Sequence, residues 1–126
     1  TARNFPNMFF TGFTQAGTNA SNSKTFVDQG FHIGYIVNEA LRRGATRIEP
    51  SQQAQDDYLA LLRSVPSFLS QFYETCTPSY FNNEGDPTKK RNIFGEPWGQ
   101  GYYTFTDMLA KWRDDGKLSG LVLETD

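Results

Sequence analysis

The residues that could bind a ligand begin close to the start of the chain. A short apolar run at 8–10 gives way to a stretch of small and polar residues, after which a helical pattern starts near Asn22. The stretch supplies five candidate residues: Gly12, Gly17, Ser21, Asn22 and Ser23. A buried strand that passes through such a turn into a helix is typical of a ligand site. The simpler alternative is an ordinary helix start capped by Asn19 or Ser21.

A second stretch, residues 76–103, has no sustained periodicity. It holds four Gly, three Pro and three Asn together with six aromatic residues. A connection of this length without its own secondary structure is usually a functional lid or disordered, and its aromatic content argues against disorder. We therefore expect a long aromatic-rich loop that docks onto another surface.

The residue counts exclude several kinds of chemistry. Cys76 is the one cysteine, so an internal disulfide is excluded and a reducing compartment such as the cytoplasm is expected. His32 is the one histidine, which excludes a multi-histidine metal site. We expect His32 to be a hydrogen-bonded, partly buried residue rather than a base. The formal net charge of −2 indicates neither nucleic acid nor an anionic membrane as partner.

Apolar spacing predicts the elements that position these residues. Strands are expected at 7–11 and 118–124, with an extended connector at 46–50. Helices are expected at 22–43, 52–65 and 104–115, and the second should restart after Pro66 over 67–73. No apolar run approaches the ~18 residues of a membrane-spanning helix.

The first long helix has apolar and small residues at intervals of three and four. This spacing predicts a face turned toward the core. The residues of that face are Val27, Phe31, Gly34, Val37 and Leu41.

The strand expected at 7–11 is apolar on consecutive residues, so both of its faces should be covered. The sequence offers only one other good strand, and the rest of the sheet is missing from it. This predicts an α/β fragment, either of a larger protein or paired with another chain. The alternative is a small α+β domain whose few strands pair antiparallel. The first residue is Thr rather than Met, which suits a processed or truncated chain.

Several motifs, in this order, resemble the C-terminal part of class B flavin-dependent monooxygenases. The similarity is greatest to Baeyer–Villiger monooxygenases that oxidise large cyclic and polycyclic ketones. The motifs cover residues 4–123. They are "NFPNMFFTGFTQAGTNASN", "FVDQGFHIGYIVNEALRRG", "RIEPS", "CTPSYFNNEG" and "GYYTFTDMLAKWRDDGKLSGLVL".

The resemblance implies the fold and the activity. Residues 1–50 would be the last strand and helix of an FAD-binding domain. Residues 51–126 would be helices, the aromatic-rich loop and a C-terminal strand, covering the cofactor site. The whole enzyme would use FAD and NADPH to insert oxygen beside the carbonyl of a small ketone, giving an ester or lactone. The sequence lacks a Gly-x-Gly-x-x-Gly turn, so N-terminal regions outside it would hold both cofactors, and this piece alone would be inactive.

The resemblance also implies roles for particular residues, none of them catalytic. Gly12 and Gly17 would let the backbone approach the flavin ring, and Ser21, Asn22 and Ser23 would place N–H groups near it. Tyr80 and Asn83 would belong to a loop that closes over the nicotinamide cofactor. Three positions depart from many relatives: Ser23 replaces methionine, Gly30 replaces histidine and Tyr80 replaces tryptophan.

Two alternative functions stay open at the level of sequence. One is a fragment of a related flavin monooxygenase that oxidises nitrogen or sulfur. The other is a stand-alone interaction module, with the aromatic sequence "WGQGYY" as its binding platform.

Overall fold

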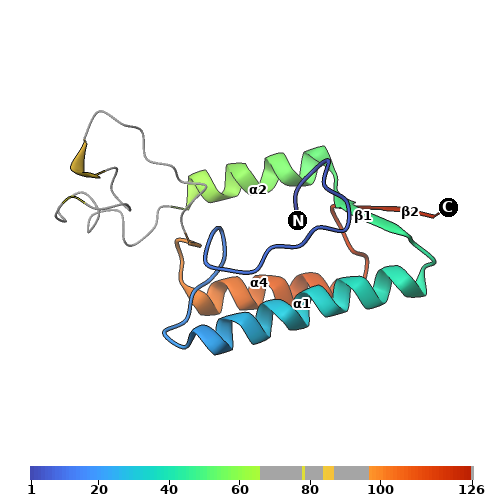
Figure 1. Cartoon of the computed structure of the whole chain (residues 1–126), viewed down its shortest axis with the longest axis horizontal. Coiled ribbons are helices and arrows are strands. Elements are labelled where there is room, and N and C mark those ends of the chain that lie inside the picture. The colour runs from blue at the N-terminus through green and yellow to red at the C-terminus, as the bar shows by residue number, and fades with distance from the viewer. Residues whose placement is uncertain (66–77, 79–83, 87–96, 126) are drawn as a thin grey trace.

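The computed structural model describes residues 1–65, 78, 84–86 and 97–125. These residues form three helices and two short strands. In chain order they are α1 (Asn22–Arg42), β1 (Arg47–Pro50), α2 (Gln52–Ser64), α4 (Tyr102–Asp115) and β2 (Leu121–Glu124). Helices α1 and α4 lie side by side, and residues 1–20 run between this pair and α2 (Figure 1). Both strands lie at the same end of the molecule.

The helices predicted at 22–43, 52–65 and 104–115 are confirmed, and local capping explains the starts of α1 and α2. The Ser21 hydroxyl accepts the N–H of Lys24 (3.4 Å) at the start of α1, and the Ser51 hydroxyl accepts the N–H of Ala54 (3.1 Å) at the start of α2. Gly44, at φ 70°, follows the end of α1 in the left-handed conformation. Helix α4 begins at Tyr102, two residues earlier than expected.

The buried face of α1 is not the face predicted from apolar spacing. Thr25, Ile36 and Ala40 are buried, whereas the predicted stripe lies on the opposite side of the helix. Its exposed fractions are 66% for Val27, 66% for Phe31, 37% for Val37 and 69% for Leu41. Both faces of α1 therefore suit burial, and the described chain covers only one of them.

The two strands form an antiparallel pair, in which Ile48 lies opposite Leu123 and Pro50 opposite Leu121. Residues 46–50 were expected to be a connector, but Ile48 is 7% exposed and packs against Leu121 and Leu123, which makes the segment a strand. The antiparallel pairing is the arrangement that the α+β alternative predicts.

The last strand is shorter than expected. Leu118 and Gly120 have φ values of 56° and 86°, so extended backbone begins only at Leu121.

The strand expected at 7–11 does not form. Among the described residues no other segment pairs with it through a ladder of backbone hydrogen bonds, and Phe10 is 60% exposed. One backbone bond, from the N–H of Asn7 to the carbonyl of Ile48 (2.9 Å), and the Asn7 side-chain amide hold the segment instead. The Asn7 amide donates to Thr46 O (3.0 Å) and accepts the N–H of Ile48 (2.9 Å).

Two apolar clusters hold the elements together. One joins Ile36 and Ala40 of α1 to Ile48 of β1, with Trp112 and the β2 leucines packed against it. The other joins Leu62 of α2 to Trp98 and Phe105. The first cluster draws on residues from both predicted parts, 1–50 and 51–126, and the division between them stays a prediction.

Some predictions fall outside the described residues. These are the helix restart at 67–73 and most of the loop at 76–103. At the end of that loop, Trp98 is only 5% exposed, and its indole N–H donates to the Thr104 hydroxyl (2.9 Å).

Candidate functional site

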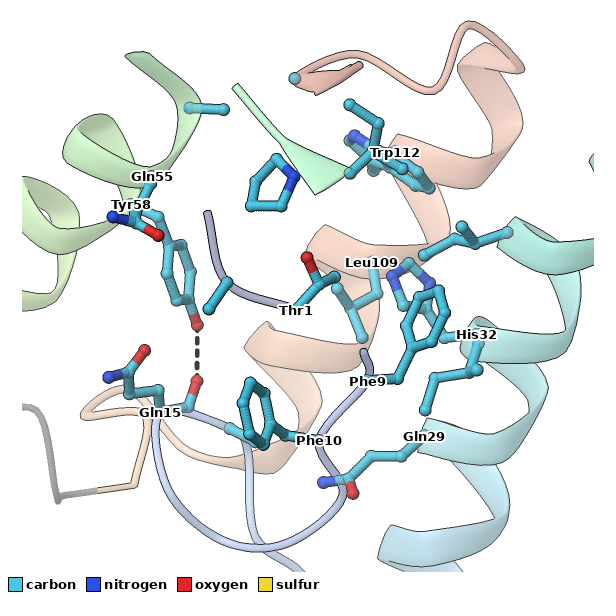
Figure 2. Close-up of a pocket in the computed structure, with 18 of the residues that line it drawn as sticks. Thr1, Phe9, Phe10, Gln15, Gln29, His32, Gln55, Tyr58, Leu109 and Trp112 are labelled. Atoms are coloured by element: carbon cyan, nitrogen blue, oxygen red, sulfur yellow. Dashed lines mark hydrogen bonds between the residues drawn. The ribbon is translucent and has the colours of Figure 1, made fainter. Parts of the chain in front are cut away.

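A cavity of about 1020 Å³ lies between residues 1–16 and the three helices. Its wall is mainly apolar, with Phe9 and Phe10 from the N-terminal segment and Leu109 and Trp112 from α4. Figure 2 shows Tyr58 reaching into this space from α2 and His32 from α1. A few polar groups in an apolar cavity are typical of a site that binds a small molecule or receives another part of a protein.

The Gln29 side chain of α1 fixes the turn at Gly12. Its amide accepts the N–H of Gly12 (2.8 Å) and donates to the carbonyl of the same residue (2.6 Å). Gly12 has φ 141°, a conformation that favours glycine, and a Cβ added there would meet nothing within 4 Å. Gly12 and Gln29 both line the cavity, so the backbone at this turn is held open to it.

Tyr58 closes the cavity on the α2 side. Its hydroxyl donates to the carbonyl of Gln15 (2.5 Å), and burial raises the pKa of Tyr58 to about 12. The hydroxyl is therefore protonated at neutral pH and ties α2 to the N-terminal segment.

His32 and Arg113 meet where α1 packs against α4. The Nδ1 atom of His32 lies 3.1 Å from Nη1 of Arg113, which can donate to the neutral imidazole, and the ring meets Trp112 edge-on. Burial, with the Arg113 charge as a second cause, lowers the pKa of His32 to about 4. Its prediction as a hydrogen-bonded, partly buried residue is confirmed. The pKa values of His32 and Tyr58 both lie far from 7, so both side chains are uncharged at neutral pH. This suits hydrogen bonding and packing rather than proton transfer.

Gly17 lies outside the cavity wall, against α4. A Cβ built on it would be 2.6 Å from Cβ of Phe105 and 3.0 Å from two atoms of that ring. Only glycine lets the loop approach α4 so closely. This packing gives Gly17 a structural role that is independent of any ligand.

The start of α1 also lies outside the cavity wall. Thr25 is 1% exposed and its hydroxyl accepts the N–H of Asn19 (3.1 Å), which fixes the loop that leads into the helix. Asn22 and Ser23 are exposed, and no acidic residue lies in the first turn. Within the described part of the chain their backbone N–H groups have no hydrogen-bond acceptor. The first turn therefore presents two free donors at the positive end of a helix.

The structure brings together only part of the predicted site. Gly12 lines the cavity, Gly17 packs on α4, and Ser21, Asn22 and Ser23 form the helix start. Tyr80 and Asn83 fall outside the described residues. The sequence named Gln29 within a motif but did not reveal its double hydrogen bond to Gly12, because no local spacing connects residues 17 positions apart.

The described residues contain no group of three acidic, histidine or cysteine side chains placed to hold a metal ion. Nor does any described helix have the length and apolar character needed to cross a membrane.

Comparison with known proteins identifies relatives along almost the whole chain. No family model matches. The Baeyer–Villiger monooxygenase peniC of Penicillium patulum is 33% identical over 116 residues, covering 90% of this chain and 19% of peniC. The FAD-binding monooxygenase hmp7 of Hypomyces subiculosus is 31% identical over 119 residues, covering 93% of this chain and 19% of hmp7.

The chain is homologous to a segment of Baeyer–Villiger monooxygenases. It spans about a fifth of the length of the curated relatives that it matches. The relationship agrees with the predicted C-terminal segment of such an enzyme.

Solved structures of monooxygenases contain the same fold. The polycyclic ketone monooxygenase from Thermothelomyces thermophila superimposes with a TM-score of 0.81 at 26% identity, covering 98% of this chain and 20% of that protein. The cyclohexanone monooxygenase from Rhodococcus sp. Phi1 bound to NADP+ has a TM-score of 0.72 at 21% identity, covering 22% of its chain, and shows the likeness of fold alone.

The described residues could supply hydrogen-bond donors to one edge of a flavin, but not the phosphate-binding turn that a whole dinucleotide needs. The free N–H groups of Asn22 and Ser23 suit an electron-rich ring edge, and Gly12 leaves open space beside the turn. No glycine-rich phosphate-binding turn occurs in the sequence. The remainder of a dinucleotide cofactor would need residues that this chain does not supply.

Proposed function

We propose that this chain is the C-terminal segment of an FAD- and NADPH-dependent monooxygenase that inserts oxygen beside a ketone carbonyl to give an ester or lactone. The proposal is supported by homology over nine-tenths of the chain to enzymes named for Baeyer–Villiger and FAD-binding monooxygenase activity. An NADP+-bound structure among the proteins of the same fold supports the second cofactor. The name of the polycyclic ketone monooxygenase supports a ketone as the substrate.

The role proposed for this segment within the enzyme rests on the first turn of α1, where the N–H groups of Asn22 and Ser23 have no acceptor among the described residues. Reduced flavin gathers negative charge at its pyrimidine end, and the N–H groups of Asn22 and Ser23 would stabilise that charge. Ser21 caps the helix, and Gly12 leaves its turn open, whereas the expected contact of Gly17 with the flavin is replaced by packing on Phe105. A bound flavin supplies the oxygen-transfer chemistry, whereas these residues orient it and shape its surroundings.

Further features of the proposal come from the resemblance. Tyr80 and Asn83 would cover the nicotinamide cofactor and exclude water. Residues 1–50 would complete the FAD-binding domain, and 51–126 would cover it. Because the cofactors would be held mainly by regions outside this sequence, the segment alone would be inactive. The cytoplasm is the proposed location.

The structure argues against the alternative of a stand-alone interaction module, because most of its expected aromatic binding surface is buried. Trp98 and Tyr102 are only 5% and 9% exposed, so these two rings of "WGQGYY" belong to the interior. Tyr103 stays exposed, and one ring is too small a surface for a platform of this kind.

Product analysis of the full-length enzyme that contains this segment tests the activity. With NADPH and oxygen, a cyclic ketone should give a lactone and the enzyme should hold FAD. Offering an amine and a sulfide in parallel separates the nitrogen- and sulfur-oxidising alternative. Exclusive amine or sulfide oxidation would overturn the proposed reaction.

A carboxylate at the helix start tests the flavin contact. Ser23→Asp in the full-length enzyme adds negative charge at the positive end of α1, which by itself stabilises a helix. If reduced flavin lies there, the flavin reduction potential should fall although the protein becomes no less stable. Ser64→Asp, at the end of α2, is the control and should leave the potential unchanged. An unchanged potential in Ser23→Asp would remove the proposed contact.

A further inference from the structure

The outer face of α1 has the character of a buried surface but is exposed in this chain. It lies on the side of the helix opposite the core residues Ile36 and Ala40. Its residues are Val27, Gly30, Phe31, Gly34, Val37, Asn38 and Leu41, none of them charged. Val27, Phe31 and Leu41 each expose about two-thirds of their surface. We call these seven residues the outer stripe of α1.

Two glycines in the middle of the outer stripe have no purpose within the described chain. A Cβ added to Gly30 or Gly34 would meet nothing within 4 Å, so no neighbouring element requires the missing side chains. Glycine is less favourable than alanine inside a helix. Residues four positions apart lie one above the other on a helix, so Gly30 and Gly34 together form a shallow notch flanked by Val27 and Phe31.

We infer that the outer stripe of α1 is the docking surface for the larger part of the same enzyme, whose backbone packs into the notch at Gly30 and Gly34. The length of the relatives indicates what covers the outer stripe. They are about five times longer than the region they share with this chain, so about four-fifths of their polypeptide is left to cover its exposed surfaces. The apolar, uncharged stripe fits an interior partner, since such a contact excludes water. The inference rests on the proposed function, because it assumes that the segment works inside such an enzyme.

Cysteine labelling in the full-length enzyme tests whether the outer stripe is covered. Val27→Cys and Leu41→Cys variants are treated with a maleimide reagent, and peptide mass spectrometry follows each site separately. The rate in denaturant gives the fully exposed reference. We expect labelling of the native enzyme to be at least ~100-fold slower, because a packed face is reached only through opening of the structure. Protection of less than about tenfold would overturn the inference.

The same experiment identifies the occupant. Protection that disappears on dilution would assign the stripe to a second copy of the enzyme, and would overturn the assignment to the same polypeptide. The result also does not depend on activity. A ketone-oxidising enzyme with an open stripe would contradict only this inference, whereas a protected stripe in an enzyme without FAD or ketone oxidation would contradict only the proposed function.

Replacing Gly34 in the notch by alanine gives an independent test, because the melting temperature should change in opposite directions for an open and for a packed helix face. On an open helix face, Gly34→Ala raises the melting temperature because alanine is the better helix former. Against a closely packed backbone the added methyl group clashes, and the melting temperature of the full-length enzyme should fall, by about 2 °C or more. A rise would show that nothing packs into the notch.

Discussion

At the scale of single residues, Gly17 shows how one missing side chain sets the distance between a loop and a helix. Its Cβ position lies 2.6 Å from Cβ of Phe105. Gly17→Ala should therefore lower the free energy of unfolding by about 1–3 kcal/mol, because the loop or α4 must shift. Urea unfolding measures the change. Ala20→Ser, at an exposed position of the same loop, is the control and should change stability by less than about 0.5 kcal/mol. Equal stability of the two variants would contradict the close approach.

His32 makes stability depend on pH. The unfolded chain takes up a proton on this imidazole near the ordinary pKa of 6.5, whereas the folded chain does so only near pKa 4. Because the unfolded state binds more protons between these values, stability should fall as pH drops from about 6.5 to about 4. His32→Gln removes this proton uptake and should make the loss of stability between pH 7 and pH 4.5 smaller. Denaturant midpoints at both pH values measure it, and an unchanged difference would mean that His32 is freely protonated when folded.

At the scale of elements, helices α1 and α2 each begin at a serine whose hydroxyl caps the first turn, whereas α4 begins after Gly101 without a side-chain cap. The Ser51 hydroxyl accepts the N–H of Ala54 (3.1 Å) at the start of α2. Ser51→Ala should lower stability by about 1 kcal/mol, and Ser51→Asp should restore it because a carboxylate accepts the same N–H. Thermal unfolding compares the variants with Ser64→Ala, at the exposed end of the helix, which should be nearly neutral. Equal effects at Ser51 and Ser64 would contradict the cap.

At the scale of the whole molecule, exposed apolar surface should govern how the 126-residue chain behaves on its own. Val27 and Leu41 expose 66% and 69% of their surface on the outer stripe. We expect the isolated chain to bind a hydrophobic dye and to self-associate. The double variant Val27→Lys, Leu41→Lys should reduce both, as measured by dye fluorescence and light scattering. Ala60→Lys, on α2, adds charge away from the stripe and should have little effect.

Local signals predicted the helices well because their causes lie within a few residues. Ser21 and Ser51 each cap the N–H three residues later, and Gly44 stops α1. The ion pairs Lys24–Asp28 and Glu39–Arg42 of α1 likewise join residues three or four positions apart. For the same reason the motifs around Gly12, Asn22 and 48–50 were enough to predict the family.

Long-range contacts caused the wrong predictions. The segment 7–11 has the composition of a strand, but strand formation needs a neighbour. Asn7 instead bonds Thr46 and Ile48, and the Gln29 side chain bonds Gly12, directly after the segment. Residues 46–50 look like a connector until β2 pairs with them.

The amino-acid sequence alone placed the three described helices to within about two residues at each end, and indicated that the chain is related to Baeyer–Villiger monooxygenases, because capping, spacing and motif order act over short distances. Only the tertiary structure decided which face of α1 is buried, which segment pairs with β2, and that Gly17 packs against Phe105 while Gln29 binds Gly12. Those outcomes depend on surfaces that meet from distant parts of the chain. A helix with two apolar faces carries no local signal that says which one its own chain will cover.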